Sequence, residues 1–169
     1  MDQALIELGE KIQRLTDENE KLDFPSFNHA DAYALGTDIV RRATERSFPI
    51  AVAIRFGEQL VFYTALAGTC ADNDLWLARK ARIVSRYNAA SLLVAARLDA
   101  IAKTLPGWDL RCDLPSFDAT VLPASGGGVP LRVRGSLIGS VAVSGLTDDQ
   151  DHDLVVDALA DAVAARNEG

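Results

Sequence analysis

His152 is the strongest single candidate for a ligand or a catalytic residue, because the chain has only 2 histidines. A neutral imidazole is a good iron ligand and carries protons near neutral pH. Helical spacing places His152 on the same side as Val155 and Leu159, so it borders an apolar stripe. This position suits either a ligand or catalyst, or a histidine at a helix boundary that makes a structural hydrogen bond, and the second use is the commoner one. His29 is a weaker candidate.

A second group combines an aromatic ring, two cations and apolar surface along one side of a predicted helix. Its members are Trp76, Arg79, Lys80, Ile83 and Tyr87. Arginine offers a planar fork to carboxylates and lysine a point charge, so the group suits haem propionates or another organic acid. Arg82 and Arg86 extend the cations around the helix. Salt bridges within or between subunits are the competing and more frequent use.

The glycine-rich stretch from Ser125 to Gly128 allows unusual dihedral angles and close approach of backbone amides to an anion. It lacks the strand, helix and lysine context of a P-loop, which favours a flexible turn that leads into a strand.

Size, charge and cysteine content limit the classes of function. A chain of 169 residues matches one domain, and its net charge of −7 disfavours nucleic acid and membrane surfaces as partners. The first 22 residues have neither the apolar core of a signal peptide nor that of a membrane span, which predicts a cytoplasmic location. Cys70 and Cys112 lack the number and spacing of a disulfide framework or zinc site, so free thiols are expected.

Two helices and a hairpin are predicted in the first part of the chain. Apolar residues at helical spacing predict a helix over residues 2–22, and Asn28 is a plausible cap for a second helix that ends before Pro49. Alternation then predicts strands over 50–55 and 60–65, joined by a turn at Gly57-Glu58. A second hairpin is predicted over 131–144, with its turn at Gly135-Ser136.

Helix is also predicted between the hairpins and at the end of the chain. Residues 72–103 lack proline and glycine and should be mainly helical, with a possible break near 97–100. Residues 105–117 should form a loop or a short edge strand. Thr147 and Gln150 fit a capping box that starts the last helix. Paired strands separated by helices predict an α+β domain with an antiparallel sheet flanked by helices, and they disfavour a parallel doubly wound fold.

Several segments taken together resemble the HbpS- and GlcG-like, or haem-degrading-domain, superfamily, and particularly its branch of uncharacterised cytoplasmic proteins. The resemblance extends from about Leu35 to Ala160. The segments that carry it are Pro49-Ile50-Ala51-Val52-Ala53-Ile54-Arg55, Leu66-Ala67-Gly68-Thr69, Asp72-Asn73-Asp74 with Trp76, Arg79-Lys80, Gly126-Gly127-Gly128-Val129-Pro130-Leu131, Val141-Ala142-Val143-Ser144-Gly145-Leu146, and Asp151-His152. The whole chain, residues 1–169, is expected to form one HbpS- and GlcG-like domain, with the helix predicted over 2–22 at its N-terminus. The resemblance implies about five antiparallel strands in a profilin-like or HbpS-like arrangement. It also implies homo-oligomers, and haem or a corrinoid-related ligand in some relatives, with the glycine stretch near the ligand cleft.

Three hypotheses for function follow. The leading one is a cytoplasmic, homo-oligomeric domain that binds a ligand or partner, with haem or a related tetrapyrrole as the named ligand. Its candidate binding residues are His152, Trp76, Arg79, Lys80, Gly127 and Gly128. The second is an enzyme that degrades haem or processes a small organic acid, with His152 and Arg79 or Lys80 in its cleft. The third is a protein-interaction scaffold without a cofactor.

Overall fold

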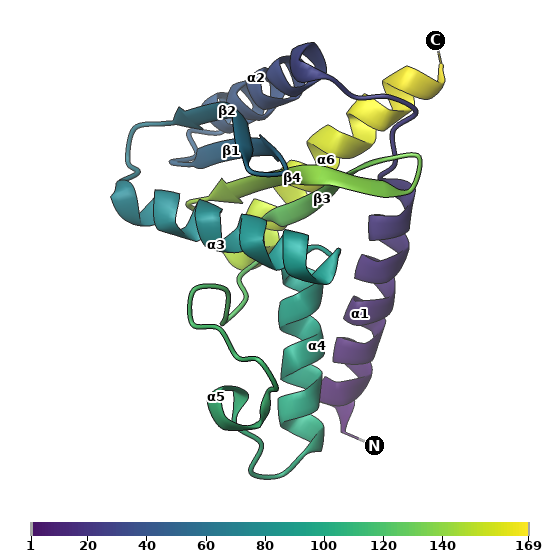
Figure 1. The fold of residues 1–169 in the computed structure, drawn as a ribbon, viewed down its shortest axis with the longest axis vertical. Helices are drawn as coiled ribbons and strands as arrows, with labels where there is room; N and C mark the ends of the chain where they lie inside the picture. The colour runs from purple at the N-terminus through teal and green to yellow at the C-terminus, as the bar shows by residue number, and fades with distance from the viewer. Residues whose placement is uncertain (1, 169) are drawn as a thin grey trace.

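In the computed structural model, which describes residues 2–168, an antiparallel sheet lies between two layers of helices (Figure 1). The strands are β1 (Ala51–Phe56), β2 (Gln59–Ala65), β3 (Gly128–Val133) and β4 (Ser136–Ser144), in the order β2-β1-β4-β3. The α+β antiparallel fold is therefore confirmed. The described residues form a sheet of four strands, where about five were expected.

The first two helices begin at side-chain caps. In α1 (Gln3–Lys21), the carboxylate of Asp2 accepts a hydrogen bond from the amide of Ala4. In α2 (His29–Glu45), Asn28 and Asp31 form a reciprocal capping box, which satisfies two amides that a helix start would otherwise leave unpaired. Both helices lie where the apolar periodicity predicts them.

Both predicted hairpins form, with one correction. The second hairpin turns at Arg134 and Gly135, whose φ angles are 50° and 79°, and not at Gly135-Ser136. A two-residue turn with positive φ at both positions has the type I′ twist that suits the flanking strands. Gly135 therefore takes the second central position of the turn, and β4 begins one residue earlier than predicted.

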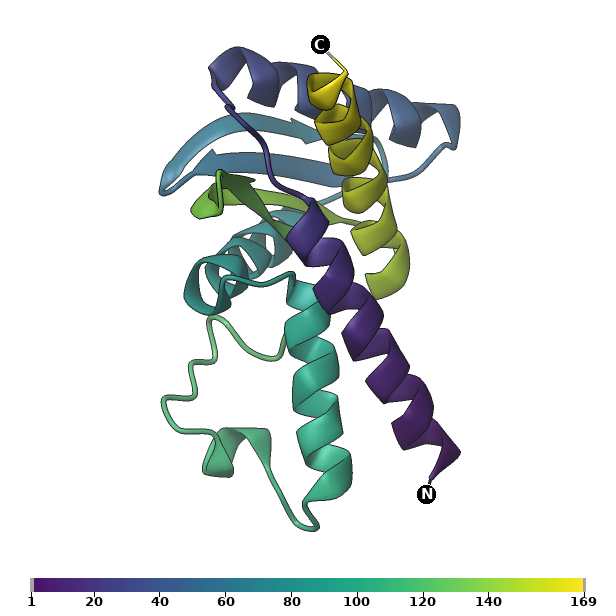
Figure 2. The same ribbon diagram turned by 90° about the vertical axis from the view of Figure 1, so that its right-hand side faces the viewer.

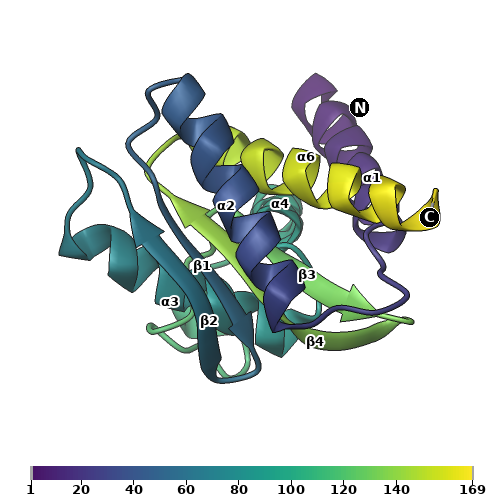
Figure 3. The same ribbon diagram turned by 90° about the horizontal axis from the view of Figure 1, so that it is seen from above.

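The two faces of the sheet carry side chains of different size. Helices α2 and α6 (Asp148–Asn167) cover one face (Figure 3). The main hydrophobic core on that side includes the strand residues Val52, Ile54, Val141 and Val143. The opposite face presents the small residues Ala51, Ala53 and Ala142 to Leu77 of α3 (Ala71–Tyr87). Small side chains allow α3 to pack close to the strands. The alternation of side chains along β1 and β4 thus places small residues beneath α3.

The long helical stretch breaks earlier than predicted. It divides into α3 and α4 (Ser91–Thr104), and the break lies at Asn88, not near residues 97–100. Asn88 adopts a left-handed conformation with φ of 48°, which asparagine tolerates better than most residues and which commonly ends a helix. Asn88 was therefore the sequence signal for the break, and a search for proline and glycine alone does not find it.

A second, smaller core lies away from the sheet. Helices α1 and α4 run side by side there (Figure 2), and Leu15 of α1 packs with Leu92 and Leu93 of α4. Residues 105–117 contain one short helix, α5 (Leu110–Asp113), capped by Asp109, so the alternative of an edge strand is wrong. None of the helices formed by residues 2–168 is long and apolar enough to cross a bilayer.

Candidate functional site

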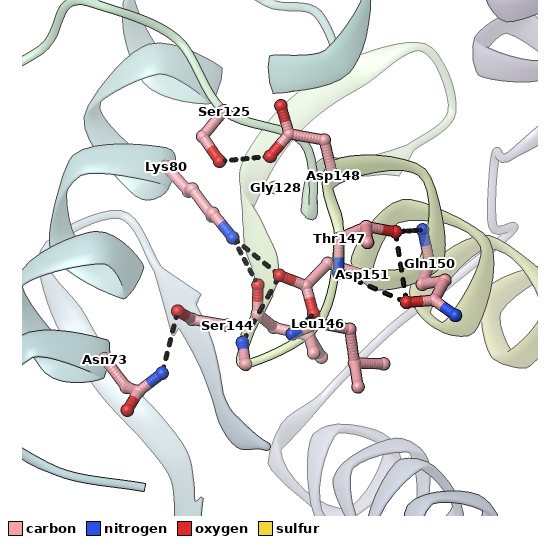
Figure 4. Close-up of polar contacts among 12 residues, drawn as sticks. Asn73, Lys80, Ser125, Gly128, Ser144, Leu146, Thr147, Asp148, Gln150 and Asp151 are labelled. Carbon is pink, nitrogen blue, oxygen red and sulfur yellow. Dashed lines mark hydrogen bonds and ion pairs between the residues drawn. The ribbon is translucent and has the colours of Figure 1, made fainter. Parts of the chain in front are cut away.

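A buried ion pair joins α3, the end of β4 and the start of α6 (Figure 4). Lys80 of α3 is only 2% exposed, and its Nζ lies 3.1 Å from Oδ2 of Asp151. The same Nζ donates a hydrogen bond of 2.8 Å to the carbonyl oxygen of Val143. Lys80 therefore reaches the end of the central strand β4 and connects α3 and α6, which pack on opposite faces of the sheet.

Asp151 is held by backbone groups as well as by Lys80. The carboxylate accepts hydrogen bonds from the amides of Leu146, at 3.0 Å, and Gly145, at 3.3 Å. Burial raises the pKa of Asp151 and lowers the pKa of Lys80, and in each case the charge of the partner opposes the shift. Both groups thus resist ionisation in this position, and each depends on the other to remain charged.

Gly127 and Gly128 pack directly over this ion pair. A Cβ atom on Gly127 would lie 2.6 Å from the carbonyl oxygen of Val143 and 3.1 Å from Nζ of Lys80. A Cβ atom on Gly128 would lie 2.9 Å from Cβ of Lys80. The amide of Gly128 donates to Oγ of the buried Ser91 at 2.9 Å. The glycines therefore allow close backbone packing here, and the Gly128 amide already has a partner.

His152 lies beneath α1. The imidazole is 1% exposed, and its Nε2 is 2.6 Å from Oε1 of Glu18, whose carboxylate accepts the hydrogen bond. The other ring nitrogen, Nδ1, is buried without a partner. In this arrangement the side chain packs between helices, and neither nitrogen faces an open cleft.

Trp76 and Arg79 lie together on the outer side of α3. The guanidinium carbon of Arg79 is 5.0 Å from the centre of a Trp76 ring, and Nη1 donates to the carbonyl oxygen of Leu122 at 2.8 Å. Both side chains line a cavity of 320 Å³, which we call the Trp76 pocket. Its lining residues are Asp72, Leu75, Trp76, Arg79, Arg82, Ala119 and Thr120. A guanidinium stacked on an indole beside open space suits a flat ligand with a carboxylate.

The six predicted residues therefore occupy three separate places. Trp76 and Arg79 face the pocket, Lys80 and the two glycines form the buried ion-pair region, and His152 lies under α1. Sequence reasoning missed Asp151 as a site residue and named it only in the Asp151-His152 segment of the family resemblance. Asp151 precedes Leu154 and Val155 by three and four residues, and this spacing indicates the buried side of the helix.

Comparisons with known proteins agree on one family. A family model described as "Haem degrading protein HbpS-like" matches residues 27–160. A UPF0303 protein of Streptomyces coelicolor is 40% identical over 149 residues, covering 88% of this chain and 90% of that protein. A UPF0303 protein of Mesorhizobium japonicum is 33% identical over 166 residues, covering 96% and 94%. These relatives are similar along nearly their whole lengths.

Solved structures share the fold at lower sequence identity. The Ybr137w protein has a TM-score of 0.78 at 24% identity, covering 99% of this chain and 96% of its own. The crystal structure of the PduOC:haem complex has a TM-score of 0.64 at 22% identity, covering 82% of this chain and 95% of that one. HbpS has a TM-score of 0.62 at 22% identity, covering 81% and 89%. At these identities the likeness concerns the arrangement of helices and strands.

Proposed function

This chain belongs to the HbpS-like haem-degrading protein family, and we propose that it is a ligand-binding domain for planar, negatively charged organic molecules. The observation that carries the proposal is the Trp76 pocket, where the Arg79 guanidinium and the Trp76 ring lie side by side at a cavity. The indole supplies a stacking surface, and Arg79 and Arg82 supply charge for a carboxylate. Haem and related tetrapyrroles are the named candidates, because a protein of similar fold has been crystallised as a haem complex.

The residues of the Trp76 pocket fit the ring and the propionates of haem better than they fit its iron. A tetrapyrrole ring and its propionates match Trp76 and the two arginines in shape and charge. The iron has no such match, because Nε2 of His152 is held by Glu18 and the ring is buried. The pocket volume of 320 Å³ lies near the lower end of the range for ligand sites, about 300–1,000 Å³. It would hold one edge of a porphyrin or the whole of a smaller aromatic acid.

Titration with haem and with iron-free protoporphyrin IX tests this proposal. We expect both to bind with similar affinity, because the ring and the propionates carry the recognition. Arg79→Ala should weaken both by about tenfold, the effect of losing one charge-assisted hydrogen bond. Arg97→Ala, at an exposed arginine of α4, is the matched control, and His152→Ala should leave the affinity unchanged. Absorbance and fluorescence quenching provide the measurements.

Two results would contradict the proposal. The first is equal affinity in the wild-type protein and Arg79→Ala, which would remove the Trp76 pocket from recognition. The second is binding that requires iron and is lost in His152→Ala, which would mean that α1 moves to expose the histidine. Loss of the haem Soret band in the presence of a reductant, beyond that of free haem, would instead favour the enzyme hypothesis.

We further propose that the domain works in the cytoplasm as a homo-oligomer. One edge of the sheet, β3, is partly covered by the bridge between Phe24 and Val133 and contains Pro130, which lacks a donor. The other edge, β2, carries the exposed apolar residues Leu60 and Tyr63, which are 46% and 44% exposed. Open edges of this kind support pairing with a second copy about a two-fold axis.

Leu60→Lys tests this mode of assembly. A charge on the edge strand should lower the molar mass measured by light scattering, because like charges would face each other across a β2–β2 contact. Leu75→Lys places the same charge at an exposed leucine of α3 and serves as the control. A monomeric wild-type mass over the whole concentration series, or equal masses for both variants, would count against assembly through β2.

A further inference from the structure

From the cluster of Arg55, Arg82 and Arg86 around one cavity, we infer a second ligand site, which binds a phosphate or diphosphate group. The cavity has a volume of 360 Å³ and lies between α3 and the turn of the first hairpin. Its lining residues are Arg55, Gly57, Glu58, Ala78, Ala81, Arg82, Ser85 and Arg86. We call it the arginine pocket. It adjoins the Trp76 pocket, because Arg82 lines both.

Strand alternation and helical spacing bring the three guanidinium groups together. Arg55 follows Ala51 and Ala53 at two-residue steps, so it extends from the face of β1 that α3 covers. Arg82 and Arg86 are four residues apart on α3 and therefore lie on one side of that helix. The small residues Ala78, Ala81 and Gly57 leave space between them, which keeps the cavity open.

These arginines are free of carboxylate partners within the part of the chain that the structure describes. No ion pair among residues 2–168 includes Arg55, Arg82 or Arg86, although the chain has 24 acidic and only 17 basic residues. In contrast, Arg41 and Arg42 of α2 each contact two carboxylates. A protein rich in acids thus keeps three guanidinium groups together without neutralising them, which produces a local positive field in a negative molecule.

The hydrogen bonds that these arginines do make leave most of their donors available. Arg55 donates to the carbonyl oxygen of Glu58 at 3.2 Å, and Arg86 donates to that of Ser116 at 2.8 Å. A guanidinium group has five N–H donors in a fixed fork, so each can still offer a pair to an oxyanion. The two backbone contacts hold the guanidinium groups in place at the cost of few donors.

Nearby acids narrow the class of ligand. Glu58 lines the pocket, and Asp118 lies close enough that, after the hydrogen bonds from Thr120, the charges of Arg86 and Arg82 help to lower its pKa. Two carboxylates oppose three guanidinium groups, so the pocket keeps a net positive charge. A carboxylate ligand has two acceptor oxygens and fills the fork of one arginine. A phosphate or diphosphate carries more charge and several acceptor oxygens, and it fits the forks of two arginines at once.

Isothermal titration with inorganic pyrophosphate and with ADP tests the site. We expect saturable binding with one pyrophosphate per chain, and an affinity that falls as the salt concentration rises. Tighter binding of ADP would identify a nucleotide as the source of the phosphate groups, whereas equal or weaker binding would identify the free anion. Either result supports the shared chemistry, and the absence of saturable binding of both would overturn it.

Variants connect the binding to the arginine pocket. Arg55→Ala and Arg86→Ala should each weaken pyrophosphate binding by about tenfold, and Arg97→Ala should have no effect. Neither Arg55 nor Arg86 lines the Trp76 pocket, so both variants should still bind protoporphyrin as the wild type does. Retained porphyrin binding also shows that the variants are folded. Equal pyrophosphate affinity in all variants would overturn the arginine pocket while leaving the proposed function unaffected.

Discussion

Lys80→Met is expected to lower the free energy of unfolding by about 3–5 kcal/mol, the usual loss when one partner of a buried ion pair is removed. The substitution leaves the carboxylate of Asp151 buried and without a counter-ion, while the carbonyl oxygen of Val143 loses a donor. Methionine is close to lysine in length and shape, so little of the loss would come from a cavity. Urea denaturation followed by circular dichroism measures the change.

A double variant separates the ion pair from the packing around it. In Asp151→Asn, the amide oxygen can still accept from the amide of Leu146 at the Oδ1 position. The NH2 group that replaces Oδ2 cannot accept from Gly145 or Lys80, and the charge that faces Lys80 is gone. The double variant with Lys80→Met and Asp151→Asn buries no charge at all. It should be more stable than the sum of the two single losses predicts, because breaking a buried pair costs more than replacing it. Additive losses would mean that the two side chains do not act as a pair.

The loss in Lys80→Met should also depend on pH. Burial raises the pKa of Asp151 above the ordinary value of 3.8, and Lys80 opposes this rise, so removing the lysine raises the pKa further. A carboxyl group with a raised pKa in the folded state binds more protons when folded than when unfolded, in the window above 3.8. The variant therefore regains stability as the pH falls through that window and is least stable, relative to the wild type, at higher pH. A difference that grows on acidification would contradict this assignment.

Local patterns predicted most of the elements, because caps, turns and apolar periodicity act over a few residues. The box at Thr147 and Gln150 marks the start of α6, and alternation marks both hairpins. The errors arose where one residue changes the local conformation, as Asn88 does between α3 and α4 and Arg134 does in the second turn. Each of these residues adopts positive φ without being glycine, so a search for glycine and proline does not reveal it.

The contents of the sites were harder to predict, because they depend on pairs that are distant in sequence. Arg79 and Lys80 are neighbours in the chain but turn about 100° apart on the helix, so one faces a pocket and the other the core. The contact of His152 with Glu18 joins residues that are 134 positions apart. No local pattern indicates that α1 would cover the histidine. Residue chemistry therefore identified candidates, and the packing of the helices decided which of them face open space.

Gly127→Ala is the second substitution for which we expect a large effect, a loss of about 3 kcal/mol or more in the free energy of unfolding. Gly127 has φ of 115°, a region that other residues enter only with strain of about 1–3 kcal/mol. The new methyl group would also lie 2.6 Å from the carbonyl oxygen of Val143, which accepts the hydrogen bond of Lys80. Relief of that contact would move the strand end on which the ion pair depends, adding a cost of overpacking of about 1–3 kcal/mol.

Gly135→Ala is a matched control for the conformational part of this cost. Gly135 has φ of 79°, but a Cβ atom there would meet nothing within 4 Å. Its replacement should cost only about 1–2 kcal/mol, the penalty for a left-handed residue. The excess loss in Gly127→Ala then measures how closely the glycine stretch packs over Lys80 and Asp151. Equal losses in the two variants would mean that the glycine stretch has room for a side chain. Gly127 would then again be a candidate residue for ligand binding.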